Sequence, residues 1–486
     1  MEPELKEITL KIDDKEVKAK EGASILEVAK NMGLNIPTLC YHKALSAFGS
    51  CRLCSVEIVD KRGRKRIVTS CNYPVEEGLV VNTKSERTIK TRKALLELLL
   101  ARCPKVPKIK ELALEYGVQA PSFWVADENE DCILCGLCTR VCDELVGVHA
   151  IDFAKRGVER EVTAPYHMFS NDCIGCGACA TVCPTKSKKT RLYTYPVLEE
   201  DAEKLNAQFL KGTLDENIGV FNGICAAKSN YKGQDGGMAT ALLVSGMQKG
   251  LFDSAIVVQR TNGYQAEAVV AENIDDIVKA KGTKYLRVKM LSLLNELIAN
   301  GKRKIALVGT PCEVRAARKI QLSLLEEHPD LQLTIVGLFC FEAFDHDKLK
   351  EAAQRLMSVD IDSAEKTQIT KGKFTATING TEHAISVREL SAAQEQGCNF
   401  CDDFTNKFAD ISVGSVGTPD GFSTVIVRSD IGAKLLENIE FTKCEVNMEE
   451  LTKLTLLKKN RAKKSFAKIT QPENQVQPPV PVPKVN

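Results

Sequence analysis

Two cysteine runs with the same internal spacing stand in the middle of this chain of 486 residues. Each run reads C-x2-C-x2-C-x3-C, a spacing in which three thiolates bind one 4Fe–4S cluster while the fourth reaches a second cluster. The runs therefore predict a pair of 4Fe–4S clusters. The predicted ligands are Cys132, Cys135, Cys138 and Cys183 for one cluster, and Cys173, Cys176, Cys179 and Cys142 for the other.

Zinc is the competing interpretation of these runs, because C-x2-C pairs also suit a zinc site. A zinc site takes its four ligands as two pairs, and two identical four-cysteine runs fit that arrangement poorly. We therefore favour a two-cluster ferredoxin module over residues 126–195. The segment 143–172 between the two runs is longer than a minimal ferredoxin needs, so it is expected to be an insertion.

A third set of cysteines precedes these runs, with the spacing C-x10-C-x2-C-x16-C. Plant-type 2Fe–2S ferredoxins use a related pattern, in which a glycine-bearing loop presents its thiolates to the cluster. Gly49 stands just before the second cysteine, as such a loop requires. A four-cysteine zinc loop remains the alternative. The predicted 2Fe–2S ligands are Cys40, Cys51, Cys54 and Cys71.

The elements that would position this third set can be read from periodicity and capping signals. Alternating apolar residues over 5–20 predict a β-hairpin, and 24–33 predict a short capped helix. Strands are expected at 56–59 and 67–69, and an amphipathic helix at 86–102.

The C-terminal half predicts an α/β domain, because short apolar strands alternate with helices. Two buried strands are followed by Cys312 and Cys340, which would meet at the carboxyl edge of the sheet, where ligands collect in such folds. Cys398 and Cys401 supply two more thiols. Convergence of the four indicates a third 4Fe–4S cluster, and buried apolar cysteines are the alternative.

A glycine-rich segment, Gly233–Thr240, precedes an apolar helix predicted over 241–250. A glycine pair before a helix lets backbone N–H groups approach a phosphate at the positive helix end. The motif is weak by itself, since many loops carry it.

The N-terminal order of hairpin, helix and cysteine loop resembles the 2Fe–2S domain of the large iron–sulfur subunit of complex I and of iron-only hydrogenases. The resemblance implies a β-grasp domain over residues 1–84. In that family the next helix leads to a further cluster with the ligand order H-x3-C-x2-C-x5-C. Here only Cys103 remains, so residues 85–125 are expected to be a helical linker that has lost this cluster.

Residues 215–445 resemble the family of coenzyme F-420 hydrogenase/dehydrogenase beta subunits. The motifs that carry the resemblance are Gly233-Gln-Asp-Gly-Gly, Gly282-Thr-Lys-Tyr285, Val308-Gly-Thr-Pro-Cys312, Gly337-Leu-Phe-Cys340, Cys398-x2-Cys401 and Ala409–Gly421. The resemblance implies an α/β domain that binds FAD and one 4Fe–4S cluster. The implied cluster ligands are Cys312, Cys340, Cys398 and Cys401. The implied FAD-binding residues are Gln234, Asp235, Gly236, Gly237, Thr240, Lys281, Thr283, Lys284 and Tyr285.

These expectations describe a multidomain α+β and α/β oxidoreductase with FAD, one 2Fe–2S cluster and three 4Fe–4S clusters. The family implies electron transfer between reduced coenzyme F-420 and a redox partner: a hydrogenase, formate dehydrogenase, heterodisulfide reductase, membrane dehydrogenase complex or ferredoxin. No acid–base catalytic residue is expected, because catalysis would consist of positioning the flavin and tuning cluster potentials. The alternatives are an NAD(P)H- or ferredoxin-linked subunit and a flavin-free electron wire. The absence of a G-x-G-x-x-G unit weighs against a nicotinamide nucleotide.

Composition limits the other function classes. The net charge of +2 gives no case for nucleic acid, and neither a transmembrane run nor a signal peptide is visible. A cytoplasmic location is expected, where clustered cysteines indicate metal sites.

Of the 19 cysteines, Cys103, Cys225 and Cys444 remain unassigned. A basic run at 185–191 is interpreted as a solvated segment, or as a site that attracts an acidic redox partner. Residues 446–486 are expected to be a basic and proline-rich tail, with a basic helix end over 458–464 and a disordered segment over 471–486.

Overall fold

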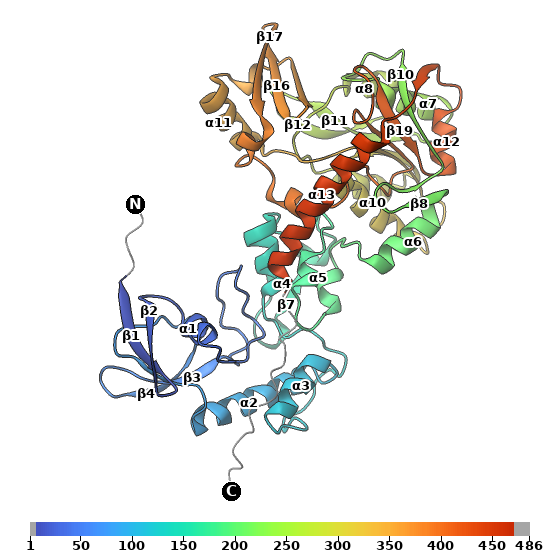
Figure 1. Cartoon of the computed structure of the whole chain (residues 1–486). Coiled ribbons are helices and arrows are strands. Elements are labelled where there is room, and N and C mark those ends of the chain that lie inside the picture. The colour runs from blue at the N-terminus through green and yellow to red at the C-terminus, as the bar shows by residue number, and fades with distance from the viewer. Residues whose placement is uncertain (1–5, 471–486) are drawn as a thin grey trace.

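The computed structural model of the protein describes residues 6–470. Three parts follow one another along the chain and lie in the same order in space (Figure 1). We call them the N-terminal domain (residues 6–84), the middle module (126–195) and the C-terminal domain (213–470).

The N-terminal domain is a five-stranded mixed sheet in the order β2-β1-β5-β3-β4, packed against one helix. Alternate residues of its first strand are buried, and the helix begins with a capping box in which Ser24 Oγ accepts from the backbone N–H of Glu27 at 3.2 Å. The predicted hairpin, helix and strands are all present. The elements are β1 (Glu7–Ile12), β2 (Lys15–Lys20), α1 (Ile25–Asn31), β3 (Ser55–Val59), β4 (Lys65–Thr69) and β5 (Val80–Asn82).

Two helices connect this domain to the middle module, namely α2 (Glu86–Arg102) and α3 (Pro107–Glu115). The first has the bounds that the sequence predicts. Arg92 of α2 is buried and donates to the carbonyl of Ser55 at 2.7 Å, so the helix is fixed to the N-terminal sheet. Cys103 follows α2 and is fully buried in an apolar core, in agreement with a structural role.

The middle module is built of short elements around two cysteine loops. Its insertion, 143–172, contains a two-stranded hairpin of β6 and β7. Its elements are α4 (Leu137–Arg140), a π-helix η1 (Val141–Val146), β6 (Asp152–Ala154), η2 (Gly157–Glu159), β7 (Glu161–Thr163), η3 (Pro165–His167), α5 (Ala178–Thr181) and η4 (Lys188–Arg191). Helix α6 (Glu199–Phe209) leads from it to the C-terminal domain.

The C-terminal domain is organised around an eight-stranded sheet in the order β12-β11-β13-β14-β18-β19-β10-β20. The four strands β11, β13, β14 and β18 are parallel, as the alternation of strands and helices predicts. Apolar cores cover both faces of the sheet. The strands are β10 (Gly223–Ser229), β11 (Ser254–Arg260), β12 (Ala266–Ala271), β13 (Lys304–Gly309), β14 (Gln332–Leu338), β18 (Ile411–Gly414), β19 (Ser423–Val427) and β20 (Phe441–Cys444).

Helices cover this sheet, and a small hairpin stands at its edge. The predicted helix after the glycine-rich segment begins three residues earlier and ends two residues earlier than expected, because Gly237 is its N-cap. The elements are β8 (Thr213–Asp215), β9 (Gly219–Phe221), α7 (Met238–Gln248), α8 (Ile274–Lys279), α9 (Leu291–Ala299), α10 (Pro311–Leu324) and α12 (Asp430–Leu436).

A separate three-stranded sheet, which the sequence analysis did not identify, has its own core with helix α11. It projects from the C-terminal domain beside the large sheet (Figure 1). The elements are α11 (His346–Met357), η5 (Ile361–Ser363), β15 (Lys366–Thr370), β16 (Lys373–Ile378), β17 (Thr381–Ser386), η6 (Val387–Leu390) and η7 (Gln396–Phe400).

Two fully buried arginines fix the core of the C-terminal domain. Arg318 of α10 lies 2.9 Å from Asp410 and donates to the carbonyl of Phe408 at 2.9 Å. Arg428 donates to the carbonyls of Ile218 and Val220, both at 2.8 Å. Because a buried charge is tolerated only when it is paired or hydrogen-bonded, these contacts fix how the helices and the β8–β9 hairpin sit on the sheet.

Residues 448–469 include the basic helix end that the sequence predicts over 458–464. They form the long helix α13 (Met448–Ile469), which runs from the C-terminal domain to the middle module (Figure 1). Its far end packs against α5 of the middle module, and the rings of Phe466 and of Phe400 in η7 meet edge to face at 5.5 Å. The proline-rich part of the predicted tail, 471–486, lies outside the described residues. Across residues 6–470, no helix combines the length and the apolar character needed to cross a bilayer.

Candidate functional site

The four N-terminal cysteines are buried together. A hydrogen bond with the Cys51 thiol lowers the pKa of Cys40 to about 6, and a hydrogen bond with Cys71 lowers the pKa of Cys54 to about 7. The charge of Cys40 also acts to raise the pKa of Cys54, so the two hydrogen-bonded pairs, Cys40 with Cys51 and Cys54 with Cys71, form one set. Backbone N–H groups point at the sulfurs: Leu39 donates to Cys51 at 3.4 Å, and Cys51 donates to Cys40 at 3.4 Å. Such donors stabilise the negative charge of metal-bound thiolates.

In the middle module, Cys183 joins the first three cysteines of the other run. Burial raises the pKa of Cys138 well above its usual value, and the charges of Cys135, Cys183 and Cys132 raise it further. The backbone N–H of Ser187 donates to Cys183 at 3.3 Å. The structure therefore brings together the four residues that the spacing assigns to the first cluster.

Cys142 joins the second run in the same way. Burial raises the pKa of Cys179, and the charges of Cys176, Cys173, Cys138 and Cys142 add to the effect. A small apolar cavity lies among the four thiols of this set. The charge of Cys138 in the first set also acts to raise the pKa of Cys179, so the two sets of the middle module adjoin one another.

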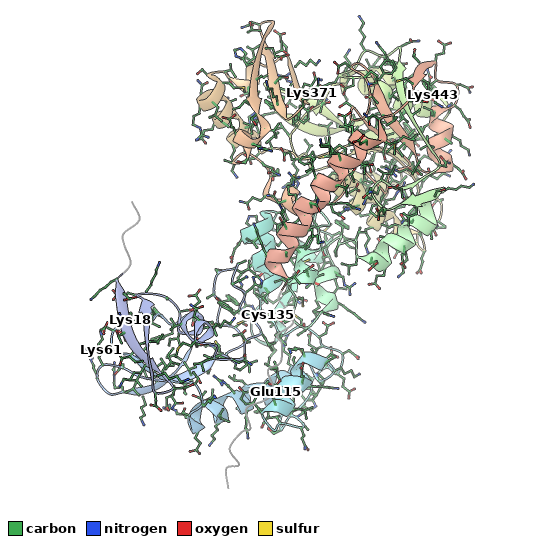
Figure 2. All side chains as sticks on the ribbon, viewed as in Figure 1. Lys18, Lys61, Glu115, Cys135, Lys371 and Lys443 are labelled. Atoms are coloured by element: carbon green, nitrogen blue, oxygen red, sulfur yellow. The ribbon has the colours of Figure 1, made fainter. Side chains whose placement is uncertain are left out.

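Arg140 joins the N-terminal set to the middle module. Its guanidinium donates to the carbonyl of Cys40 at 2.8 Å and to that of Gly136 at 3.1 Å, and it also contacts the carbonyl of Ser46. Across this junction, the charge of Cys40 acts to raise the pKa of Cys135. In Figure 2, Cys135 lies at the narrow middle of the molecule, between the N-terminal domain and the C-terminal part.

The four C-terminal cysteines converge at the carboxyl edge of the large sheet, as the strand endings predict. Burial raises the pKa of Cys340 to about 12; the nearby Lys458 ammonium opposes this, while the charges of Cys312 and Cys401 add to it. Burial likewise raises the pKa of Cys398 to about 12, with Cys340 as the next cause. The set combines two strand ends with the η7 loop.

Two basic side chains of α13 lie against this C-terminal set. Lys458 is buried, and its ammonium donates to the carbonyl of Cys340. Burial acts to lower the pKa of Lys458, but the charges of Cys401, Cys340 and Cys398 outweigh it, so the pKa is raised. Arg461 donates to the carbonyl of Cys398 at 3.2 Å. The thiols therefore face a buried cation, which favours their charged form.

Gly175 allows close packing within the middle module, and Gly397 allows the middle module to approach the C-terminal set closely. A Cβ atom on Gly175 would lie 2.7 Å from the carbonyl oxygen of Tyr195, and one on Gly397 would lie 2.5 Å from Ile174. Gly175 stands between Cys173 and Cys176, and Gly397 precedes Cys398. A larger residue at position 397 would push the middle module away from the C-terminal set. Within residues 6–470, no three side chains of His, Cys, Asp or Glu converge on a point that would suit a single metal ion.

The glycine-rich segment and the 281–285 turn, predicted as parts of one flavin site, lie against each other. The amide nitrogen of Gln234 donates to the carbonyl of Thr367 at 2.8 Å and to the Tyr285 hydroxyl at 3.4 Å. The backbone N–H of Thr283 donates to the Gln234 oxygen at 3.4 Å. A Cβ atom on Gly236 would lie 2.3 Å from the carbonyl oxygen of Ala227, so this position admits only glycine. Gly237 caps α7, which leaves helix N–H groups at the loop.

Other members of the predicted flavin set differ in placement. Lys281 is exposed, Asp235 and Thr240 are half-buried, and burial raises the pKa of Asp235. The Lys284 ammonium is turned inward and donates to the carbonyl of Val258 at 2.9 Å. Burial lowers the pKa of Lys284 to about 8. This lysine therefore holds the turn rather than facing outward.

A polar cavity of about 420 Å³ lies beside this turn, next to Leu286 and Phe344. The Phe344 backbone N–H donates to the carbonyl of Tyr285 at 2.8 Å, so the cavity adjoins the predicted flavin residues without including them.

Comparison with known proteins follows the same division of the chain. The family of coenzyme F-420 hydrogenase/dehydrogenase beta subunits matches with its N-terminal region at residues 224–295 and its C-terminal region at 302–453. A 2Fe–2S iron–sulfur cluster binding domain matches residues 5–86, and a 4Fe–4S dicluster domain matches 131–187. A solved chain of the F-420-reducing [NiFe] hydrogenase complex from Methanosarcina barkeri is 31% identical, with a TM-score of 0.50, and the match covers 52% of this chain and 94% of that one.

The chain belongs to the family of coenzyme F-420 hydrogenase/dehydrogenase beta subunits. The resemblance predicted from the motifs is confirmed, and the protein is a mixed α/β multidomain chain with 2Fe–2S and 4Fe–4S ferredoxin-type domains.

Two curated relatives show how much of each protein's length the similarity covers. Coenzyme F-420-dependent sulfite reductase of Methanocaldococcus jannaschii is 36% identical over 49% of this chain and 40% of its own length. A subunit of the F(420)H(2) dehydrogenase of Methanosarcina mazei is 35% identical over 46% of this chain and 63% of its own length. The chain therefore spans less than two thirds of both relatives.

Sequence reasoning missed the basic residues that join or face the cysteine sets in this family member. Arg140 lies inside the first cysteine run, between Cys138 and Cys142. Its position among the predicted ligands could have indicated a role beside the cysteine sets. Lys458 stands in a basic stretch of apparent tail, and no local pattern distinguishes it from its neighbours. Cys225 and Cys444 lie on the adjoining strands β10 and β20, apart from the four sets.

Arg140→Met is expected to loosen the contact between the N-terminal loop and the middle module. A hydrogen bond from a charged group contributes about 1.5–3 kcal/mol, so amide hydrogen exchange in residues 39–51 should accelerate by about tenfold or more. Mass spectrometry of peptides from this loop measures the effect. Arg156→Met, an exposed arginine in the same module, is the matched control. Equal exchange in the two variants would show that Arg140 does not hold the junction.

Proposed function

We propose that this protein transfers electrons between reduced coenzyme F-420 and a redox partner, through FAD and a chain of iron–sulfur clusters. The observation that carries the proposal is the unbroken succession of four cysteine sets, from the N-terminal loop to the C-terminal domain. The charge of Cys40 raises the pKa of Cys135, the charge of Cys138 raises the pKa of Cys179, and Gly397 lets the Cys398 loop pack closely against the middle module. Relatives in the same family are named for reactions of coenzyme F-420, which supports it as the substrate.

The cysteine sets fit the proposed clusters by their donor chemistry. Each set is made of four thiols, and backbone N–H groups donate to sulfur in every set. Hydrogen bonds of this kind and nearby charge tune the potential of a cluster. We assign a 2Fe–2S cluster to the N-terminal set and a 4Fe–4S cluster to each of the other three.

The C-terminal domain is proposed to bind FAD between the glycine-rich segment and the 281–285 turn. FAD would take up two electrons together and release them one at a time. The chain's own contribution is positional: Gln234 ties the two loops together, Gly236 lets backbone approach the ligand, and the N-terminal end of α7 offers N–H groups to its phosphates. The adjoining polar cavity leaves room for a substrate beside the flavin.

Anaerobic mixing of the purified protein with reduced coenzyme F-420 tests the function. Reduction of flavin and of clusters is expected, with NADH and NADPH inactive in parallel samples. Bound iron should number about 14 atoms per chain, with matching acid-labile sulfide. If reduced coenzyme F-420 leaves both flavin and clusters oxidised, the proposed substrate is wrong; zinc in place of iron would remove the electron chain itself.

Gln234→Ala tests the flavin site separately. The substitution removes the contacts that hold the two loops together, and because each such hydrogen bond contributes about 0.5–1.5 kcal/mol, flavin affinity should fall about tenfold. Titration of flavin-free protein with FAD, followed by fluorescence, gives the dissociation constants. Gln332→Ala, at an exposed position at the start of β14, is the control. Unchanged affinity in Gln234→Ala would place the flavin elsewhere.

Lys458→Met is expected to lower the reduction potential of the C-terminal cluster, because removal of a buried positive charge disfavours the more negative reduced state. Two unit charges about 6 Å apart interact by about 3 kcal/mol at an effective dielectric constant of about 20, roughly 100 mV for one electron. Redox titration monitored by electron paramagnetic resonance measures the potential. Lys459→Met is the control, because in the native protein the Lys459 ammonium donates to the carbonyl of Glu216 and not to a residue of the cysteine set. Identical potentials in both variants would contradict a role for Lys458.

A further inference from the structure

The insertion of the middle module carries exposed apolar side chains that no described element covers. Tyr166 is 91% exposed, Met168 63% and Phe169 40%, and Leu192 from the following segment is 53% exposed. Single exposed apolar residues are ordinary on soluble proteins, whereas a group of large ones marks an interaction site. We call these four residues the Met168 surface.

The four residues are close in space because the two segments pack together. The rings of His167 and Tyr193 meet at 5.8 Å, and those of Phe169 and Tyr195 stack at 5.2 Å. The backbone N–H of Ser170 donates to the carbonyl of Tyr193 at 3.1 Å. Residues 166–170 therefore lie along residues 192–195, and both segments contribute exposed apolar side chains to this border.

This border lies directly over the second cysteine set of the middle module. The Tyr195 backbone N–H donates to the Cys173 sulfur at 3.3 Å. The Cys179 thiol donates to the carbonyl of Thr190 at 3.7 Å. One layer of side chains thus separates the Met168 surface from the thiols that we assign to a 4Fe–4S cluster.

A basic segment leads into the Met168 surface at Leu192. The segment 186–191 contains four basic residues and no acidic one. Lys189 pairs with Glu130 at 2.7 Å and Arg191 with Glu200 at 3.0 Å. Lys186 and Lys188 are exposed and take part in no ion pair within residues 6–470. Their charges are therefore available to a partner.

We propose that the Met168 surface, with Lys186 and Lys188, docks an acidic one-electron carrier protein of the iron–sulfur class. An apolar centre supplies contact area, and unpaired lysines steer an oppositely charged protein towards it. Encounters between redox proteins use small interfaces, below about 1,200 Å², so a patch of this kind is sufficient. One electron passes between the carrier's cluster and the cluster at the second set, and no bond is formed or broken.

This inference rests on the proposed function only in assuming that a cluster occupies the second set. It adds an entry or exit for electrons in the middle of the chain, separate from the N-terminal domain and from the flavin. An acidic carrier could then exchange electrons with the protein without passing through either end.

Binding is tested with the complete, cluster-loaded protein and an oxidised two-cluster bacterial ferredoxin with an acidic surface, by isothermal titration calorimetry. Both proteins stay oxidised, so the readout does not depend on turnover. Lys186→Glu/Lys188→Glu should weaken binding by about tenfold at about 20 mM salt, and the difference should shrink at about 500 mM, where screening removes it. Met168→Asp should weaken binding at both salt concentrations.

Lys61→Glu is the matched charge control. Lys61 is exposed on the N-terminal domain, away from Cys135 and the middle module (Figure 2). It should bind ferredoxin as the native protein does. Reduction of viologen dye by reduced coenzyme F-420 is measured on every variant and should be unchanged, because the surface takes no part in that reaction.

The outcomes separate this inference from the proposed function. If the native protein fails to bind ferredoxin, or if Lys61→Glu weakens binding as much as the double variant, the docking surface is wrong. If binding follows the expected pattern while reduced coenzyme F-420 reduces nothing, the docking surface stands and the proposed function falls.

Discussion

Sixteen cysteine thiols must be kept in four groups, each shielded from water and each close to the next, and the rest of the structure depends on this constraint. A buried thiolate is unfavourable unless donors or cations compensate its charge. The chain supplies both: backbone N–H groups at the sulfurs, Arg140 across the first junction and Lys458 beside the last set. The same contacts that compensate charge also fix the modules against one another.

Contact between modules is achieved with small residues as well as with charges. Gly397 leaves room for Ile174 of the middle module to touch the Cys398 loop. The Arg315–Asp402 ion pair lies nearby, and the Arg315 charge holds the pKa of Asp402 well below its usual range. Close packing therefore fixes the middle module against the C-terminal cysteine set.

How much of this could be predicted from sequence depends on how local each feature is. The spacing of the runs was sufficient to assign Cys142 and Cys183 to opposite sets, because the rule concerns neighbouring residues. The C-terminal set was harder: Cys312 and Cys398 are far apart in sequence, and only strand endings and family motifs indicated that they meet. The sheet of β15–β17 was missed although alternate residues such as Phe374 and Ala376 are buried, a period-two signal that was present. Lys458 gave no local signal, since its partners lie over 50 residues away.

The position of α13 has a consequence for how the protein is made. Chains emerge from the ribosome with the N-terminal part first, and domains fold as they become complete. The N-terminal domain and the middle module contain all their cysteines before residue 184, so both can mature during synthesis. The C-terminal set receives Lys458 only after the preceding strands have left the ribosome. Its assembly is therefore a late step of biosynthesis, and the same helix that completes it also seals the contact with the earlier module.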